Sequence, residues 1–371
     1  MGWEIITRHT VLKDILPWRY RVRTILGYSS AALPSIYTGV PPAQHGHWSM
    51  WYYAPETSAF KKTKIISHLP ELTIGSRNIS RGIVSRIYKR FSGITNYFCI
   101  YDIPIRHLHK FDLSAYHDIY RPGAFNGIES IFDVLENRRV PRLILSWKTP
   151  AEDAFRLLLE EINGKTKRFY FWYFPDLDAL LHTSGTHDEK KIAIFLARLE
   201  EQVTELYRLA GKKYREVKLY LFSDHGMTNV TDTIDLWSQI KKLPLTEFED
   251  YVPFYDSTMA RFYTFSGRAR DILMKFFLSC PVGSVLSEEE LKGLGAYFPD
   301  NKFGDIIYLL HPGKLINPSF MGTIPPRAMH GYHPDDKDSF AAFLSNQEVN
   351  LPLNSICDFY SIMKQDAMAL S

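Results

Sequence analysis

Residues 169–226 read FYFWYFPDLDALLHTSGTHDEKKIAIFLARLEEQVTELYRLAGKKYREVKLYLFSDHG, and this stretch decides the fold. It begins with the apolar run 169–174, which is typical of a strand in the middle of a parallel sheet. Residues 189–209 carry apolar side chains at helical spacing, and Gly211 is expected to end that helix. Residues 217–222 predict a second strand. Strand, helix and strand in this order indicate a right-handed crossover unit of an α/β sheet.

The same alternation continues upstream. Residues 140–147 predict a further strand and residues 151–162 an amphipathic helix. The stretch 51–145 is irregular and rich in aromatic residues, which indicates an insertion. We expect one α/β/α domain with a mostly parallel central sheet over residues 1–371, with this first insertion and a second one at about 245–325.

Composition excludes several classes of protein. With 45% hydrophobic and 23% charged residues among 371, the chain is expected to be a folded globular protein rather than a disordered one. A net charge of +3 gives no reason to expect a nucleic acid polymer as partner, and no apolar run approaches the roughly 18–20 residues of a membrane span. Cys99, Cys280 and Cys357 form no zinc ribbon and no disulfide framework. The start shows no secretory signal pattern, so a cytoplasmic location is expected.

Polar residues follow both strands of the crossover unit directly. Asp176 and Asp178 come after the first strand, and Asp224 and His225 come after the second. In open α/β sheets the ligand site lies beyond the carboxyl ends of the strands. The chemistry of this chain is therefore expected at this edge of the sheet.

Asp178 and His182 are four residues apart, which on a helical turn puts both side chains on one face, about 6 Å apart. Such a pair could hold one metal ion. A capping aspartate followed by an exposed histidine has the same spacing. Asp176 is a rival ligand, but its distance of six residues from His182 is not a same-face spacing, so Asp178 is preferred.

Asp224 and His225 are adjacent at a strand end, where both can reach one cation, and Gly226 would let the backbone turn away. Mixed oxygen and nitrogen ligands suit Zn²⁺ and also Mn²⁺. An Asp-His pair in an exposed turn is the alternative.

Two further residues are weaker candidates on their own. His330 lies in the sequence MHGYHP, flanked by prolines, which indicates a loop that reaches toward a site. Ser29 follows Gly27-Tyr28 and precedes a predicted helix, where free backbone N–H groups favour an alkoxide or a phosphate. A solvated loop histidine and a simple N-cap serine are the alternatives.

The order of these features is more specific than any one of them. It runs as follows: Ser29, Thr38-Gly39, Pro42, His45-Gly46, Asp178 with His182 and Gly185, Asp224-His225-Gly226, and His330-Gly331-Tyr332. This order resembles the alkaline phosphatase superfamily, and within it the type I phosphodiesterase / nucleotide pyrophosphatase branch. In that superfamily the nucleophile lies nine residues before the Thr of a Thr-Gly signature, which selects Ser29 over Ser30.

The resemblance implies a hydrolase with a Ser29 nucleophile and two divalent metal ions, Zn²⁺ or else Mn²⁺. One ion would be held by Asp178, His182 and His330. The other would be held by Asp224, His225 and the Ser29 oxygen. Two cations about 4 Å apart can activate the nucleophile, neutralise phosphate oxygens and stabilise the leaving group. Arg261 is a weaker candidate, which could bind a phosphate with two parallel hydrogen bonds or could lie at the edge of the core.

Hydrolysis of a phosphodiester or pyrophosphate ester of a small molecule is the activity that the resemblance implies. A phosphomonoesterase or a phospho-group transferase of the same superfamily is the nearest alternative. A sulfatase is disfavoured because residues 29–33 read SSAAL and lack the CxPxR pattern. From a different class, the alternative is a non-catalytic binding protein with an incomplete metal site. Neither the leaving group nor the oligomeric state can be assigned from the sequence.

One departure from the resemblance concerns the N-terminus. The family's second metal also takes an Asp from the end of a first core strand, upstream of the nucleophile. Only 28 residues precede Ser29 here, and their acidic residues, Glu4 and Asp14, follow no suitable apolar strand. We therefore expect that the sequence starts late and lacks this strand, or else that the second metal is bound poorly.

Overall fold

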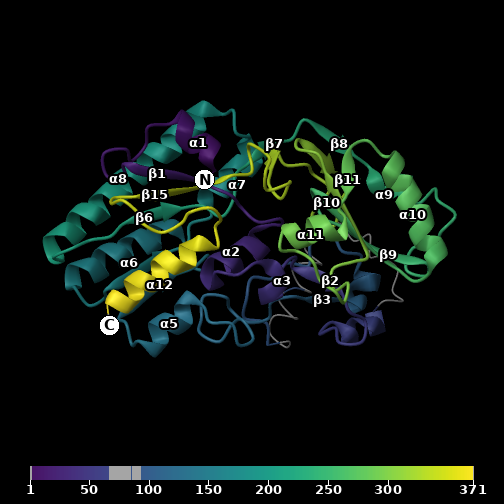
Figure 1. Cartoon of the computed structure of the whole chain (residues 1–371), viewed down its shortest axis with the longest axis horizontal. Helices are drawn as coiled ribbons and strands as arrows, with labels where there is room; N and C mark the ends of the chain where they lie inside the picture. Colours follow the sequence, from purple (N-terminus) through teal and green to yellow (C-terminus); the bar gives the residue numbers. More distant parts are fainter. Residues whose placement is uncertain (1, 67–84, 86–92, 371) are drawn as a thin grey trace.

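The strand that leads to Asp224 belongs to a sheet built around the buried strand β15. The computed structural model describes residues 2–66, 85 and 93–370 (Figure 1). β15 (Ala341–Ser345) pairs antiparallel with β1 (Trp18–Val22) on one edge and with β6 (Tyr220–Phe222) on the other. β1 and β6 therefore run in the same direction. A separate parallel pair is formed by β4 (Arg142–Leu145) and β5 (Phe169–Trp172).

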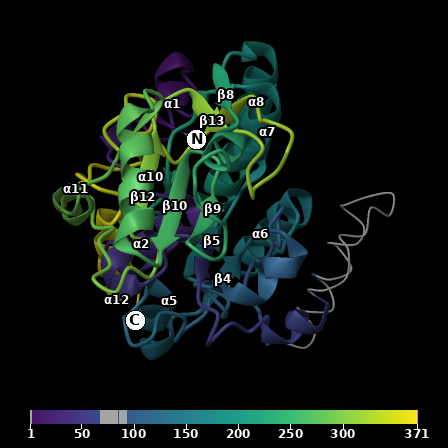
Figure 2. The same ribbon diagram turned by 90° about the vertical axis from the view of Figure 1, so that its right-hand side faces the viewer.

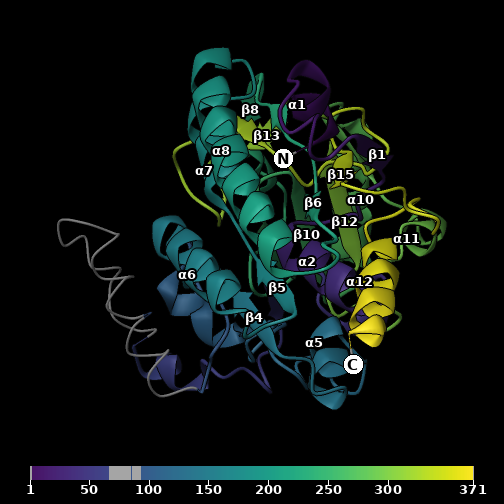
Figure 3. The same cartoon turned by 90° about the vertical axis from the view of Figure 1, so that its left-hand side faces the viewer.

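Helices cover these strands on two sides, as Figure 3 shows. α6 (Ala151–Gly164) and α8 (Glu189–Lys213) lie together on one side. The other side carries α2 (Ser29–Thr38), α5 (Ile131–Asn137) and α12 (Asp358–Ala369). Phe343 of β15 shows how the layers join, since its ring stacks on Phe222 at 5.9 Å and packs on Phe359 of α12 at 4.9 Å. The result is an α/β/α arrangement.

A second sheet lies beside this sandwich and occupies the right half of Figure 1. Its order is β11 (Gly283–Val285), β12 (Ile306–Leu310), β10 (Met259–Thr264) and β9 (Tyr251–Tyr255). Figure 2 shows α10 (Gly267–Ser279) lying along β12 and β10. These elements fall inside the second predicted insertion, 245–325. Of the first predicted insertion, 51–145, residues 67–84 and 86–92 lie outside the described residues. The boundaries of both insertions stay predictions.

Short elements complete the described chain. The helices and 3-10 turns are α1 (Trp3–Arg8), α3 (Pro42–His45), η1 (Lys61–Ile66), η2 (Ile105–Lys110), α7 (Asp176–Ser184), α9 (Leu236–Ile240) and α11 (Glu288–Gly293). The strand pairs are β2 (Trp51–Tyr53) with β3 (Phe111–Leu113), β7 (Thr228–Asn229) with β14 (Ala328–Met329), and β8 (Asp232–Ile234) with β13 (Lys314–Ile316). Among the described residues, no helix is both long and apolar enough to cross a membrane.

The predicted crossover unit is present, but two of its details differ from the expectation. α8 continues through Gly211 to Lys213 and ends only at Tyr214, since a single glycine weakens a helix without breaking it. β5 and β6 are not hydrogen-bonded neighbours; β5 pairs with β4, and β6 pairs with β15. The crossover helix α8 therefore connects strands that belong to separate ladders.

Gly226 is required by close packing and not by a turn of the backbone. Its φ is not positive, whereas a Cβ added to it would lie 1.9 Å from the carbonyl oxygen of Asp338 and 2.9 Å from that of Phe340. Both obstacles are backbone atoms, which cannot rotate away. The sequence-based interpretation of Gly226 is corrected accordingly.

We expect Gly226→Ala to lower the free energy of unfolding by about 2–3 kcal/mol, the usual cost of overpacking a rigid site. Gly211→Ala is the matched control and should raise it by about 0.5–1 kcal/mol, because this helical position has free space around it. Urea unfolding of the two variants measures both changes. A Gly226→Ala variant as stable as the unmodified chain would contradict the close approach to Asp338.

Candidate active site

Asp178 and His182 lie one turn apart on α7, as the spacing predicts. The Nε2 atom of His182 is 3.2 Å from Oδ2 of Asp178. On the other side of the ring, Nδ1 donates a hydrogen bond of 2.9 Å to the carbonyl of Ala328 in β14, which leaves Nε2 to face the site. Burial opposes charge on both groups, but their mutual hydrogen bond lowers the pKa of Asp178 and raises that of His182. The pair therefore favours an ionised Asp178.

His330 joins this pair from the loop that follows β14. Its Nε2 atom is 3.7 Å from Oδ1 of Asp178. Burial, and then the neighbouring His225, hold the pKa of His330 well below its usual range. The ring is therefore neutral, which is the form that binds metal ions.

A hydrogen-bond relay fixes the loop of His330 against the start of α2. The hydroxyl of Thr258 donates to the carbonyl of Gly331 at 2.9 Å, and the Tyr28 hydroxyl lies 2.8 Å from the same Thr258 oxygen. Tyr28 precedes Ser29, and Gly331 follows His330. Thr258 thus links the side chain of Tyr28, next to Ser29, to the backbone of Gly331, next to His330.

Asp224 and His225 follow β6 at the carboxyl edge of the first sheet. His225 donates from Nδ1 to the carbonyl of Gly226 at 2.9 Å, so its Nε2 is free to accept a hydrogen bond or bind a cation. This Nε2 lies 3.3 Å from Oδ2 of Asp224 and 3.0 Å from Oγ of Ser29. Ser29 and His225, which are 196 positions apart in the sequence, are therefore in direct contact.

Ser29 is the first residue of α2 and not its N-cap. Tyr28 occupies the N-cap position with an extended backbone and makes no side-chain capping bond. The Ser29 hydroxyl is therefore directed to His225 and does not cap the helix. Its position beside the free N–H groups of the first turn favours negative charge on the oxygen.

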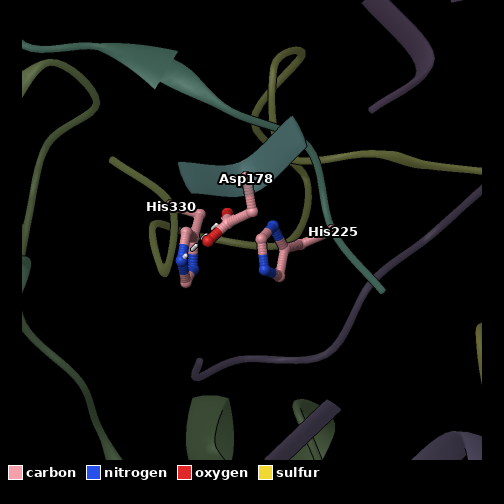
Figure 4. A group of neighbouring side chains, drawn as sticks. All are labelled: Asp178, His225 and His330. Carbon is pink, nitrogen blue, oxygen red and sulfur yellow. Dashed lines mark ion pairs between the residues drawn. The ribbon is translucent and has the colours of Figure 1, made fainter. Parts of the chain in front are cut away.

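The two predicted ligand groups adjoin at their histidines. The rings of His225 and His330 stack with centroids 3.7 Å apart. One ligand atom each from Asp178, His225 and His330 lies within 4.8 Å of the others (Figure 4). The figure shows the Asp178 carboxylate directed toward the two imidazole rings.

Three polar atoms at this centre have no hydrogen-bond partner among the described residues. They are Oδ1 of Asp178, Oδ2 of Asp224 and Nδ1 of His330, all shielded from solvent. An unpaired buried polar atom costs about 1–3 kcal/mol, and more when it is charged. Two carboxylate oxygens and neutral imidazoles are a suitable donor set for Zn²⁺ or Mn²⁺. The residues at this site therefore fit a bound divalent cation.

Arg261 does not face the site, and its predicted substrate role is corrected. Its side chain is fully buried in β10, where Nε is 2.8 Å from Oδ2 of Asp256. One terminal nitrogen donates to Ser49 and to the carbonyl of Trp51. A phosphate has no access to this guanidinium, because burial and these partners use its donors.

Sequence reasoning missed one residue beside the site, Tyr173. Burial and then the carboxylates of Asp224 and Asp178 raise the pKa of its hydroxyl, and its ring packs 5.9 Å from that of Tyr120. No pattern in the sequence signals this position beside the site, since a tyrosine at the end of an aromatic strand is equally typical of the core. Asp176, the rival ligand, is exposed in the first turn of α7.

The family model for type I phosphodiesterase / nucleotide pyrophosphatase matches residues 27–332, which is more than half of the chain. None of the curated protein sequences matches the chain.

Solved structures of one relative share the fold. Murine ectonucleotide pyrophosphatase / phosphodiesterase 5 is 15% identical with a TM-score of 0.68, over 99% of this chain and 92% of that one. An inactive variant of that mouse protein in complex with AMP gives 0.67 at 15% identity, over the same 99% and 92%. The human protein gives 0.63 at 14% identity, over 94% and 86%. The predicted alkaline-phosphatase-like fold is confirmed. The chain therefore belongs to the type I phosphodiesterase / nucleotide pyrophosphatase family and is a phosphoric ester hydrolase.

Proposed function

We propose that this chain hydrolyses phosphodiester or pyrophosphate bonds in nucleotide-like small molecules, with Ser29 as nucleophile and two divalent cations at the site. The contact of 3.0 Å between Oγ of Ser29 and Nε2 of His225, at the edge of the Asp178, His225 and His330 cluster, carries the proposal. The AMP complex of the mouse relative supports a nucleotide as the small-molecule substrate.

The proposed ligand groups are the two sets that the resemblance implies, and the contacts of Asp178 with His182 and of His225 with Ser29 support them. Asp178, His182 and His330 would hold one cation, and Asp224, His225 and the Ser29 oxygen would hold the other. Such cations neutralise the charge of phosphate oxygens and lower the pKa of a bound hydroxyl or water. Zn²⁺ fits these nitrogen and oxygen ligands, and Mn²⁺ is the second choice.

In the proposed reaction Ser29 attacks phosphorus. A bond forms between its Oγ and phosphorus, the bond from phosphorus to the leaving oxygen breaks, and the hydroxyl proton ends on the leaving group, which gives a phosphodiester between Ser29 and the retained part of the substrate. Water then attacks the same phosphorus and releases Ser29. The N-terminus of α2 supports both steps, because its free N–H groups favour negative charge on Oγ and on the phosphate.

The metal content of the purified protein tests the ligand assignment. After dialysis without chelator, we expect bound transition metal, and His330→Ala should remove a large part of it. His333→Ala is the matched control, since this histidine lies in the same loop but outside the cluster. Full occupancy in a double variant with His182→Ala and His330→Ala would refute the assignment.

Turnover of a chromogenic phosphodiester tests the nucleophile. Ser29→Ala should lower the rate by about a thousandfold or more, as loss of a nucleophile does elsewhere. Ser30→Ala, at the next position of α2, should have little effect. Thermal unfolding should be nearly unchanged in both variants. An active Ser29→Ala with an inactive Ser30→Ala would reverse the assignment.

A further inference from the structure

The turn between β9 and β10 brings the second sheet to the candidate active site. Residues 256–258 form this turn, and all three are buried. Thr258, the last of them, is fully buried, so water cannot replace a hydrogen bond that its side chain loses. The partners of Thr258 therefore all lie within the protein.

The hydrogen bonds of Thr258 have a fixed direction. Its backbone N–H donates to the Tyr28 hydroxyl at 3.0 Å, and its own hydroxyl donates to the carbonyl of Gly331 at 2.9 Å. A carbonyl cannot donate, so the single hydroxyl hydrogen of Thr258 is used there. The Tyr28 hydroxyl, 2.8 Å from Oγ1 of Thr258, must therefore be the donor of that contact. The relay runs from Tyr28 through Thr258 to Gly331 and admits one arrangement of hydrogens.

Each end of the relay adjoins a candidate residue of the site. Tyr28 precedes Ser29, and the Tyr28 carbonyl accepts two backbone hydrogen bonds of the first turn of α2, at 2.8 and 3.0 Å. A fixed Tyr28 side chain therefore holds this turn and Ser29 with it. At the other end, Gly331 follows His330, and the Tyr28 ring packs edge-on against the His330 imidazole with centroids 5.7 Å apart.

The approach of the His330 loop to the relay requires a glycine at position 331. The backbone φ of Gly331 is +90°, in the region that favours glycine. A Cβ added there would lie 2.7 Å from Cε1 of Tyr28 and 2.9 Å from Oγ1 of Thr258. A side chain would therefore push the loop away from both residues. The three residues are closely packed as well as hydrogen-bonded.

The second sheet holds the turn in place. The carbonyl of Thr258 accepts from the N–H of Leu310 in β12 at 2.9 Å. The carbonyl of Ser257 accepts from the N–H of Ile316 in β13 at 2.8 Å. Asp256 is held by its buried ion pair with β10. The turn therefore cannot shift unless the second sheet shifts with it.

We propose that Thr258 is a positioning residue that sets the distance between Ser29 and His330 and thereby how firmly the site holds its cations. The inference rests on the proposed function, in which Ser29 belongs to one ligand group and His330 to the other. Thr258 contributes no ligand and acts through Tyr28 and Gly331. The second sheet, beside the sandwich in Figure 1, thus supports the site through one turn.

The His330 ring reports its own position without metal or turnover. It stacks on His225 with centroids 3.7 Å apart, so the ring current of His225 shields its protons. The sample is the chelator-treated 371-residue chain with isotope-labelled histidine, and His330→Ala assigns the resonance. Thr258→Val should move the His330 Hε1 resonance downfield, because the loop loses its hydrogen bond and the stack loosens. Thr258→Ser keeps the hydroxyl and should keep the resonance in place.

Zn²⁺ affinity, measured by competition with a chelating dye, is the second readout. Thr258→Val should weaken it by about tenfold to a hundredfold, the usual effect of losing a group that orients a ligand. Thr258→Ser should restore it. Thr63→Val is the matched control, since Thr63 is buried in η1 and its hydroxyl also donates to a backbone carbonyl, that of Phe60 at 2.7 Å. This control should lower thermal stability but leave the affinity and the His330 resonance unchanged.

Tyr28→Phe tests the relay from its other end and decides the matter if Thr258→Val does not fold. It removes the donor to Thr258 but keeps the ring, and it should move the His330 resonance in the same direction. An unchanged resonance in the folded variants that break the relay overturns the proposal, as does a Thr258→Ser variant that rescues neither readout. An unmodified chain that binds no Zn²⁺ refutes the proposed function and the claim on affinity; the His330 resonance then decides alone whether Thr258 positions the ring.

Discussion

The shared direction of β5 and β6 is the constraint on which the site depends. Both strands end at the same edge of the sandwich. α7 with Asp178 follows β5, and the turn with Asp224 and His225 follows β6, so these residues lie together at that edge. α8 makes this possible, because its 25 residues return the chain along the sandwich before β6 begins. The antiparallel strand β15 then fixes β6 in register, with Phe222 opposite Phe343.

Burial and neighbouring side chains set the protonation states of the residues at this edge. Asp178 keeps its negative charge because its hydrogen bond with His182 stabilises the carboxylate, while burial and His225 keep His330 neutral. The backbone fixes the orientation of His182 and His225, since each donates from Nδ1 to a carbonyl and presents Nε2. Unpaired oxygens of Asp178 and Asp224 remain at the centre. This combination is unfavourable without a cation and favourable with one.

The sequence was informative where local geometry or motif order fixes a position. The spacing of Asp178 and His182 is a property of one helical turn, and the contact of Ser29 with His225 was accessible through the order of the motifs. Arg261 could not be placed, because burial and its partner Asp256 depend on packing that a single sequence does not display. Gly226 likewise needs the position of Asp338, more than a hundred residues away. The adjacency of β5 and β6 was expected from the crossover pattern, but that pattern does not state which strands pair.

Tertiary side-chain contacts set the distance between the two predicted ligand groups. In the described chain, no ladder connects β5, which carries α7, to β6, which carries Asp224 and His225. Side chains bridge the gap instead: the rings of Phe171 and Phe222 are 6.5 Å apart, and His225 stacks on His330. Such contacts hold a separation less firmly than a ladder does, because each ring can shift while ladder hydrogen bonds fix register and distance together. A site that works at ångström precision needs rigid support, so the strength of the connection between β5 and β6 determines how well the ligand groups are held at one distance.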